Sequence, residues 1–367
     1  MIFDKLERFF MKTVAFHTLG CKVNTYETEA MQQLMESAGY KCVEFTKRAD
    51  VYIINTCSVT NIADRKSRQM LHRARKMNED AIVVAAGCYV ESAKDKIDED
   101  LSIDIIVGNN NKNDIVNIIN EYLQDKIKNK FIIDINKETE YEEFNISKIN
   151  DHTRAFIKVQ DGCNQFCSYC IIPFTRGRVR SRRMENIIDE VKNLSASGYK
   201  EIVLTGINTA LYGEDLHQGI GKSMVDVINK ISTILGDFRI RIGSLEPTVV
   251  NKEYINLIKN LPKLCRHAHL SVQSGSNDVL AAMGRNYTRE EYIDIVDMLR
   301  DAHGNYGIST DIIVGFPGES EKDFEQSLML VEKIPFTKVH IFRYSERAGT
   351  PAAGFKNMIK EEIKTRR

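Results

Sequence analysis

The sequence predicts an α/β protein made of two successive regions of parallel β-sheet. Over residues 12–125, short runs rich in β-branched residues alternate with stretches whose apolar residues recur at helical spacing. This alternation is typical of a parallel sheet with helices on both faces. After a polar stretch at 126–150, six further strand-like runs alternate with helical patterns, which predicts a barrel or partial barrel.

The N-terminal region carries the first predicted sheet. Its expected strands are residues 13–19, 51–56, 81–87 and 103–108. Its expected helices are residues 25–39, 65–77 and 113–127, with a charged helical stretch after the third strand. We interpret the polar stretch 126–150 as a linker with one short strand at "FIIDI".

Cysteines follow three of these strands, namely Cys21, Cys57 and Cys88. In an open parallel sheet the carboxyl ends of all strands lie on one edge, where ligands bind. We therefore expect the three thiols to converge at that edge. The alternative is three small buried residues, since free cysteine packs well in a core.

Bulk composition narrows the class of protein. The formal net charge is zero, so no global positive field draws the chain to nucleic acid. No apolar run approaches the roughly 20 residues of a membrane helix, and the N-terminus lacks the features of a signal peptide. We expect a cytoplasmic protein with no membrane partner and with residues 1–11 as an extension. In that reducing compartment, eight cysteines indicate metal or redox chemistry rather than disulfides.

The second region contains six expected strands, which lie within residues 155–160, 201–208, 239–247, 267–276, 307–319 and 338–345. Each run ends in residues such as Gly, Ser, Glu, Gln or Pro. In barrels of this kind, functional residues sit on the loops that follow the strands.

The stretch "DGCNQFCSYC" follows the first of these strands and places Cys163, Cys167 and Cys170 within two short turns. A structural zinc site normally has four protein ligands, and no fourth Cys or His follows at finger spacing. Zinc remains an alternative. An iron–sulfur cluster held by three thiolates would have one iron free to bind a substrate or cofactor.

This motif resembles that of radical S-adenosylmethionine (SAM) enzymes. The resemblance implies that the open iron chelates the amino and carboxylate groups of SAM, and that electron transfer into the sulfonium releases a 5′-deoxyadenosyl radical. An aromatic residue usually precedes the third cysteine in that family, beside the adenine, and Tyr169 holds this place. The resemblance also assigns SAM contacts to residues at later strand ends, namely Thr205, Gly206, Ser244, Glu246 and Gln273. For each of them, the alternative is a turn or helix-cap residue.

Over residues 12–350 the chain is similar to the methylthiotransferase group of that family. The matching segments include "TLGCKVN", "NTCSVT", "AGCY", "SVQSGS" and "FRYSERAGTPA". The resemblance implies a flavodoxin-like domain over 12–125, with a second [4Fe-4S] cluster on Cys21, Cys57 and Cys88. It implies a radical SAM partial (β/α)6 TIM-type barrel over 151–355. One SAM would supply the methyl group and another the radical, with a sulfur donor and an electron donor such as flavodoxin or ferredoxin.

The group has three known substrate classes. Two are tRNA adenosines next to the anticodon that carry isopentenyl or threonylcarbamoyl groups, and the third is an aspartate of a ribosomal protein. The stretch "NTCSVTNIADRKSRQMLHRARK" looks like the branch that converts N6-threonylcarbamoyladenosine at position 37 of tRNA to its 2-methylthio derivative, with Ser58 where Thr is usual. The other two substrates remain alternatives. A non-catalytic RNA-binding metalloprotein is an alternative of another class.

Two basic runs are candidate contacts for the phosphates of a tRNA anticodon stem-loop. The first run supplies Arg65, Lys66, Arg68, Arg73 and Arg75, and the second supplies Arg176, Arg178, Arg180, Arg182 and Arg183. The alternative is that they form solvated helix faces, or that the second run serves the cofactor or stabilises the barrel. Residues 356–367 stand where the tRNA branches begin a small RNA-binding TRAM domain. We interpret Cys42 and Cys265 as structural.

Overall fold

The computed structural model describes residues 12–94, 96–144, 146, 154–216 and 223–367 of the chain. The chain divides into two compact units. Unit 1 comprises Met1–Asp151 and Phe174–Arg178, and unit 2 comprises His152–Pro173 and Val179–Arg367. Within the described residues, every helix is too short or too polar to cross a bilayer.

Unit 1 is built on a six-stranded sheet in which every strand pair is parallel, in the order β2-β1-β3-β4-β5-β6. The strands are β1 (Thr13–Thr18), β2 (Lys41–Val43), β3 (Val51–Thr56), β4 (Ile82–Gly87), β5 (Ile105–Val107) and β6 (Asn129–Phe131). The helices are α1 (Lys22–Ser37), α2 (Asn61–Met77), α3 (Cys88–Ser92) and α4 (Ile115–Asp125), with 3-10 turns η3 (Ile97–Glu99) and η4 (Lys112–Asp114). The order is the flavodoxin-like order extended by β6, so this part of the predicted fold class is confirmed.

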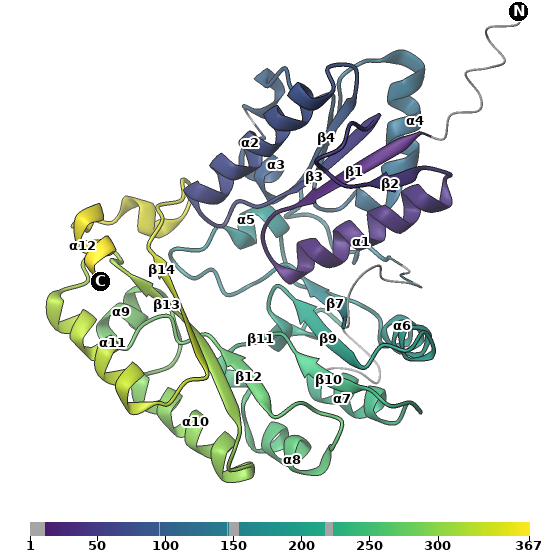
Figure 1. Ribbon diagram of the computed structural model, residues 1–367. Coiled ribbons are helices and arrows are strands. Elements are labelled where there is room, and N and C mark those ends of the chain that lie inside the picture. Colours follow the sequence, from purple (N-terminus) through teal and green to yellow (C-terminus); the bar gives the residue numbers. More distant parts are fainter. Residues whose placement is uncertain (1–11, 95, 145, 147–153, 217–222) are drawn as a thin grey trace, which may run out of the picture. The chain divides into compact units, whose positions relative to one another are not determined.

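Alternation along the strands gives unit 1 two apolar cores, one on each face of the sheet. Val51 and Ile53 of β3 pack in the core that includes Met31 of α1 and Ile118 of α4. Their neighbours Tyr52 and Ile54 pack in the other core, with Leu71 of α2 and Val90 of α3. Figure 1 shows these helices around the strands in the purple to blue part of the chain.

Two elements of unit 1 differ from the prediction. β2 was not predicted, because its three residues give no readable alternation. The predicted strand at 131–135 lies instead at Asn129–Phe131, where it pairs with β5. The described residues of the stretch interpreted as a linker therefore extend the sheet of unit 1, and Ile135, Phe144 and Ile146 are buried.

Unit 2 contains six parallel strand positions, as predicted. The strands are β7 (Ala155–Asp161), β8 (Arg180–Ser181), β9 (Glu201–Gly206), β10 (Arg239–Ile242), β11 (Ser244–Leu245), β12 (His267–Leu270), β13 (Gly307–Val314) and β14 (Lys338–Arg343). They form two sheets, β10-β9-β7-β8 and β11-β12-β13-β14. β10 and β11 are two pieces of one predicted strand, interrupted at Gly243, and β8 adds a short antiparallel edge. This arrangement confirms the partial barrel.

Helices follow the strands of unit 2. They are α5 (Ile172–Arg176), whose last residues belong to unit 1, α6 (Met184–Ala196), α7 (Met224–Ser232), α8 (Lys252–Asn260), α9 (Asn277–Ala282), α10 (Arg289–Ala302), α11 (Glu321–Lys333) and α12 (Glu361–Arg366). The 3-10 turns are η5 (Thr209–Leu211), η6 (Pro247–Val249) and η7 (Pro351–Gly354). Capping boxes begin α10, at Thr288 with Glu291, and α11, at Ser320 with Asp323, so the sequence itself sets these starts.

Residues 356–367 contact other parts of unit 2. Lys364 of α12 donates to the carbonyl oxygen of Tyr344 at 3.2 Å. Arg367 forms a buried ion pair with Glu319, at 2.5 Å between Nη1 and Oε2. The C-terminal helix therefore packs on unit 2.

Candidate functional site

The three cysteines of unit 1 lie where the strands β1, β3 and β4 end. Cys21 is the residue before α1, Cys57 follows β3, and Cys88 begins α3 directly after β4. Gly20 has a φ of +104°, and a Cβ placed there would lie 2.9 Å from Cβ and 3.0 Å from Sγ of Cys57. The turn that carries Cys21 therefore lies directly against Cys57.

Polar contacts fix these strand ends to one another. The Thr56 hydroxyl donates to the carbonyl oxygen of Ala86 at 2.5 Å and accepts from the Tyr89 amide at 3.2 Å. The Asn24 side chain donates to the carbonyl oxygens of Leu19 at 2.6 Å and Thr56 at 2.9 Å. The residues beside all three cysteines thus form one hydrogen-bonded group.

Burial raises the pKa of two thiols of this trio, Cys21 and Cys57. Burial, and then the neighbouring Cys88, raise the pKa of Cys57 to about 12. Although Cys21 is exposed as a residue, the chain around its sulfur desolvates the thiol and raises its pKa, against the opposing charge of Arg176. A metal centre that binds here must displace thiol protons, as metal–thiolate sites do.

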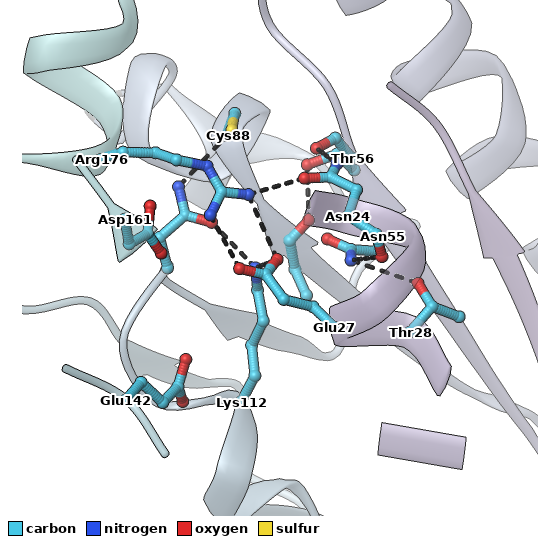
Figure 2. A network of polar contacts seen from close by, with 12 residues as sticks. Asn24, Glu27, Thr28, Asn55, Thr56, Cys88, Lys112, Glu142, Asp161 and Arg176 are labelled. Carbon is cyan, nitrogen blue, oxygen red and sulfur yellow. Dashed lines mark hydrogen bonds and ion pairs between the residues drawn. The ribbon is translucent and has the colours of Figure 1, made fainter. Parts of the chain in front are cut away.

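A buried charged network lies beside the trio (Figure 2). Arg176 donates to both carboxylate oxygens of Glu27 and to Oδ1 of Asn24 at 2.6 Å. Lys112 donates to the same carboxylate and to Oδ1 of Asn109, at 2.9 Å for the latter. The Asn109 amide donates to Sγ of Cys88 at 3.6 Å, which connects the network to a cysteine sulfur.

The cysteine motif of unit 2 begins directly after β7. Asp161, the last residue of the strand, accepts from the Gly162 amide at 2.8 Å and from Nζ of Lys158 at 2.9 Å. The Gln160 side chain donates to the carbonyl oxygens of Asp161 and Gly162 at 2.7 and 2.6 Å. The backbone is thereby held in place ahead of Cys163.

The middle of the motif is anchored at Ser168. Its amide and its hydroxyl donate to the carbonyl oxygens of Met283 and Ala282, at 2.9 and 2.8 Å. Its own carbonyl accepts from the Ala352 amide at 2.8 Å. The loop between Cys167 and Cys170 is therefore clamped between the end of α9 and η7.

Amide donors also approach the sulfurs of this trio. Cys163 accepts from the Gln165 amide at 3.5 Å and from the Asn208 side chain at 3.9 Å. Burial raises the pKa of Cys170 to about 12 despite a backbone donor at Ile172, with Cys167 and Cys163 adding to the rise. N–H donors of this kind stabilise thiolate ligands and tune iron–sulfur clusters.

The spacing of the sulfurs suits a centre larger than one ion. Among the described residues, three ligand atoms all lie within 4.8 Å of one another only at His269, Asp311 and His340, so in each cysteine trio at least one pair of sulfurs is more than 4.8 Å apart. A tetrahedral zinc with Zn–S bonds of about 2.3 Å needs sulfurs about 3.8 Å apart. The residues present therefore fit an iron–sulfur cluster better than a single zinc ion.

The structure brings two of the predicted SAM residues close to this trio. Tyr169 packs against a cluster that includes Phe316 and Tyr344, and burial raises the pKa of its hydroxyl. Glu246 is buried and pairs with Arg285 at 2.7 Å. Burial raises the pKa of the Glu246 carboxyl, and Arg285 opposes that shift.

The remaining predicted residues lie at strand ends. Thr205 and Gly206 end β9, and Gly206 leaves room for Gln160, whose Oε1 would lie 3.0 Å from an added Cβ. Ser244 begins β11 and is exposed. Gln273 has a φ of +70° and exchanges backbone hydrogen bonds with Asp311 and Ile313.

Sequence reasoning missed several residues around both trios. Asn208 is the last residue of the predicted strand 201–208, where a polar residue at a strand end was the available signal. Arg285 follows α9 and carries no local signal. Lys112 and Glu27 meet across 85 positions of sequence, so no motif marks them.

The two basic runs have different environments. Arg65, Lys66, Arg68 and Arg73 are exposed on α2, whereas Arg75 binds the carbonyl oxygens of Glu79 and Ala81 and the carboxylate of Asp104.

In the second run, Arg176, Arg180 and Arg182 are buried. They pair with Glu27, Asp161 and Glu190, respectively. The prediction of phosphate contacts is wrong for these three, because their charges are neutralised inside the protein. Arg178 and Arg183 are exposed.

Comparisons with known proteins agree with this arrangement. The radical SAM superfamily matches residues 157–331, and the family described as uncharacterized protein family UPF0004 matches residues 13–108. The threonylcarbamoyladenosine tRNA methylthiotransferase of Bacillus subtilis is 42% identical over 97% of this chain and 79% of its own length. The tRNA-2-methylthio-N(6)-dimethylallyladenosine synthase of Clostridium botulinum is 38% identical over 95% of this chain and 78% of its own.

The structure of the radical SAM methyltransferase TsrM from Kitasatospora setae has a TM-score of 0.68 at 14% identity and covers 94% of this chain and 77% of its own. At that identity the likeness concerns the fold alone. A chain with both domains, a cysteine trio in each, and this identity to the curated relatives defines an α/β enzyme of the radical SAM class. It belongs to the radical SAM methylthiotransferase family.

Proposed function

We propose that this protein converts N6-threonylcarbamoyladenosine in tRNA to its 2-methylthio derivative. The observation that carries the proposal is the presence of one cysteine trio at the strand ends of each unit, in a chain 42% identical to a methylthiotransferase of that specificity. Forming a C–S bond at an unactivated C–H position requires both a radical source and a sulfur source, which gives each trio a separate role.

In this proposal each trio holds one [4Fe-4S] cluster. When bound, the clusters and SAM supply the hydrogen-abstracting radical, the methyl group and a site for the transferred sulfur. Cys163, Cys167 and Cys170 hold the cluster that binds SAM, and Cys21, Cys57 and Cys88 hold the other. The amides of Asn208 and Asn109, which already lie near Cys163 and Cys88, stabilise the thiolates.

Residues of unit 2 orient SAM in this proposal. Tyr169 supplies a ring surface for the adenine, and the strand ends at Thr205, Gly206, Ser244 and Gln273 supply backbone and hydroxyl groups. Glu246 is held by Arg285 in a fixed position, which suits a carboxylate that receives hydrogen bonds from ribose or the SAM amino group. Burial removes water from the Glu246 carboxyl and raises its pKa. A hydrogen-bond donor of SAM would replace part of that lost water.

The tRNA contacts are assigned to the exposed side of α2. This helix begins four residues after Cys57 and presents Arg65, Lys66, Arg68 and Arg73. Phosphate contacts there would set an anticodon stem-loop in register, with the target base turned out of its loop. A tRNA substrate places the enzyme in the cytoplasm, with a small electron-transfer protein such as flavodoxin or ferredoxin and a sulfur donor as partners.

The second candidate is the isopentenyladenosine substrate of the dimethylallyladenosine synthases, supported by the 38% identity to one of them. Mass spectrometry of tRNA nucleosides separates the two. The gene is expressed in one bacterial strain that lacks its threonylcarbamoyladenosine methylthiotransferase and in another that lacks its dimethylallyladenosine enzyme. We expect the 2-methylthio product to return only in the first strain.

Two variants separate the roles of the trios. Cys163→Ala should abolish cleavage of SAM, whereas Cys57→Ala should leave SAM cleavage measurable and abolish methylthio product. Iron and sulfide analysis of each variant should give about half of the wild-type content. Product only in the second strain would move the proposal to isopentenyladenosine. Zinc without sulfide in the wild-type protein would favour a non-catalytic metalloprotein.

A further inference from the structure

Three metal-ligand side chains gather on strands of unit 2 that carry none of the six cysteines of the two trios. His269 lies on β12, Asp311 on β13 and His340 on β14, and their ligand atoms all lie within 4.8 Å of one another. Nε2 of His269 is 3.1 Å from Oδ2 of Asp311. The two imidazole rings meet edge to face, with centroids 5.9 Å apart. Figure 1 shows the three strands side by side.

The backbone pairing places these residues together. Asp311 is directly opposite His340 in the β13–β14 ladder, and His269 is opposite Ser309, two residues before Asp311. Because side chains alternate along a strand, these four share one face of the sheet. Thr310, between Ser309 and Asp311, faces the other way, toward Tyr292 of α10. The cluster is therefore a property of the strand register.

The hydroxyl groups of Ser309 and Ser271 hold the His269 ring in a fixed orientation. Oγ of Ser309 lies 3.0 Å from Nδ1 of His269 and 3.1 Å from Nε2 of His267. Oγ of Ser271 lies 3.1 Å from Nε2 of His269 and donates to Oδ2 of Asp311 at 3.0 Å. With Nδ1 occupied by Ser309, Nε2 of His269 is turned toward Asp311. Metal-binding histidines are typically held in this way through their second nitrogen.

Hydrogen bonding alone explains only part of the cluster. It accounts for His269 and Asp311, which bond to each other and to the two serines. Within the described residues, His340 makes no hydrogen bond to either of them, yet its ring nitrogen lies within 4.8 Å of both ligand atoms. The strand register places His340 opposite Asp311, and an ion shared by the three groups would use the ring nitrogen that is not hydrogen-bonded to the other two side chains.

We propose that His269, Asp311 and His340 bind one divalent transition-metal ion, with Zn²⁺ as the representative. Two imidazoles and one carboxylate suit zinc, cobalt, nickel and ferrous iron and disfavour magnesium and calcium, which prefer oxygen ligands alone. Three protein ligands leave at least one position for water or another small ligand, as in zinc sites that are not closed. This site lies beyond the proposed methylthiotransferase activity and does not depend on it.

The test uses the full chain with its clusters reconstituted and adventitious metal removed. The protein is dialysed against ZnCl2, and zinc and iron are measured in the same sample by mass spectrometry. We expect about one zinc per chain in addition to the cluster iron. Zinc K-edge absorption should show nitrogen and oxygen neighbours at about 2.0–2.1 Å and no sulfur at about 2.3 Å.

Substitutions of the proposed ligands test whether the extra zinc binds at His269, Asp311 and His340. Asp311→Asn and His340→Gln should each abolish the extra zinc. Ser309→Ala, which removes only the hydroxyl that holds His269, should weaken zinc binding about 10- to 100-fold. The matched control is His72→Gln, because His72 also pairs with an aspartate, Asp100, at 2.9 Å on the surface of unit 1. This control should bind zinc as the wild type does.

Three results would overturn the proposal. They are a wild-type chain without extra zinc, zinc uptake that survives both ligand substitutions, and a sulfur shell that places the ion at cysteines. Melting curves measured without zinc check that the variants fold. His340 lies on β14, at the edge of its sheet, so His340→Gln remains informative if Asp311→Asn does not fold.

Discussion

Arg176 and Glu27 form a two-point ion pair in which neither side chain reaches solvent. Nη1 lies 2.7 Å from Oε1 and Nη2 lies 3.2 Å from Oε2. The equally buried Lys112 binds the same carboxylate, so these three side chains alone carry a net charge of +1, with the buried carboxyl of Glu91 close to both cations. The charge of Arg176 opposes the rise in pKa that burial causes at Cys21 and Cys57, and Glu27 counters it at Cys21. The Arg176 charge complements thiolate ligands, which are negative.

Glu27→Gln should strongly destabilise unit 1. It raises the summed charge of the side chains at positions 27, 112 and 176 from +1 to +2, and removing one partner of a buried ion pair typically costs about 3–5 kcal/mol. Urea denaturation of the cluster-free protein measures the loss. The double variant Glu27→Gln/Lys112→Met returns the net charge to +1 and should recover part of it. Glu325→Gln, on the exposed side of α11, is the control and should change stability by less than about 0.5 kcal/mol. A Glu27→Gln loss as small as the control's would contradict the electrostatic account.

Gly87→Ala should disturb the Cys88 turn more than an ordinary glycine substitution. Gly87 has a φ of +97°, and an added Cβ would lie 2.6 Å from Oδ1 of Asn55 and 2.8 Å from the carbonyl oxygen of Thr56. Gly39→Ala is the matched control, because Gly39 has a φ of +89° and an added Cβ there meets no described atom within 4 Å.

A positive φ disfavours alanine at both positions, and Gly87 also has a ψ of −158°, a combination that is essentially restricted to glycine and adds a backbone cost of roughly 1–3 kcal/mol. We expect Gly87→Ala to exceed Gly39→Ala in lost unfolding free energy and to lower the iron content by about one cluster after reconstitution. Equal losses in the two variants would mean that the turn relaxes without displacing Cys88.

Neutralising the exposed basic face of α2 should weaken tRNA binding in a salt-dependent way. Each lost phosphate contact lowers the slope of log K against log salt by about 0.7–0.9. The triple variant Arg65→Ala/Lys66→Ala/Arg73→Ala should therefore lower it by about 2–3, measured by filter binding over a salt series. Lys200→Ala removes an exposed lysine of unit 2 as the control. An unchanged slope in the triple variant would assign tRNA to another surface.

The acid stability of unit 2 should depend on Glu201. Hydrogen bonds from Arg241, with the charges of Arg241, Arg239 and Arg154, lower the pKa of Glu201 from its ordinary 4.5 despite partial burial. A carboxyl with a lowered folded-state pKa contributes its full stability above its unfolded pKa and loses it as the pH falls through the folded value. The free energy of unfolding, measured with urea at pH 3–7, should therefore fall less steeply as the pH is lowered in Glu201→Gln than in the wild type. Parallel curves for the two proteins would rule out this contribution.

The strands were predictable because their signal is local. β3 and β4 are buried along their whole length and read as continuous apolar runs, and each ends at the polar or glycine residue that marks a strand end. The three-residue β2 lacks enough positions for a pattern, and β6 lies in a polar stretch where pairing with β5 overrides propensity.

The cysteine positions were predictable for a related reason, since parallel topology alone places strand ends at one edge of a sheet. The residues that surround the cysteines were harder to predict from the sequence. The second basic run looks solvated in the sequence. In the structure three of its members, Arg176, Arg180 and Arg182, are buried and form ion pairs with Glu27, Asp161 and Glu190. Two of these partners lie within 20 positions of their arginine, while Glu27 is 149 positions away. Charge neutralised by a distant residue leaves no trace in the local pattern.

The hydrogen bond from the Ala352 amide to the Ser168 carbonyl has a consequence for biosynthesis. The segment around Cys167 is synthesised first, whereas one side of its clamp, at Ala352, follows about 180 residues later in the sequence. A nascent chain that has reached only α9 therefore presents the motif with one of its two supports. Stable loading of iron and sulfide at that motif is thus expected only after η7 has been synthesised and has folded against it.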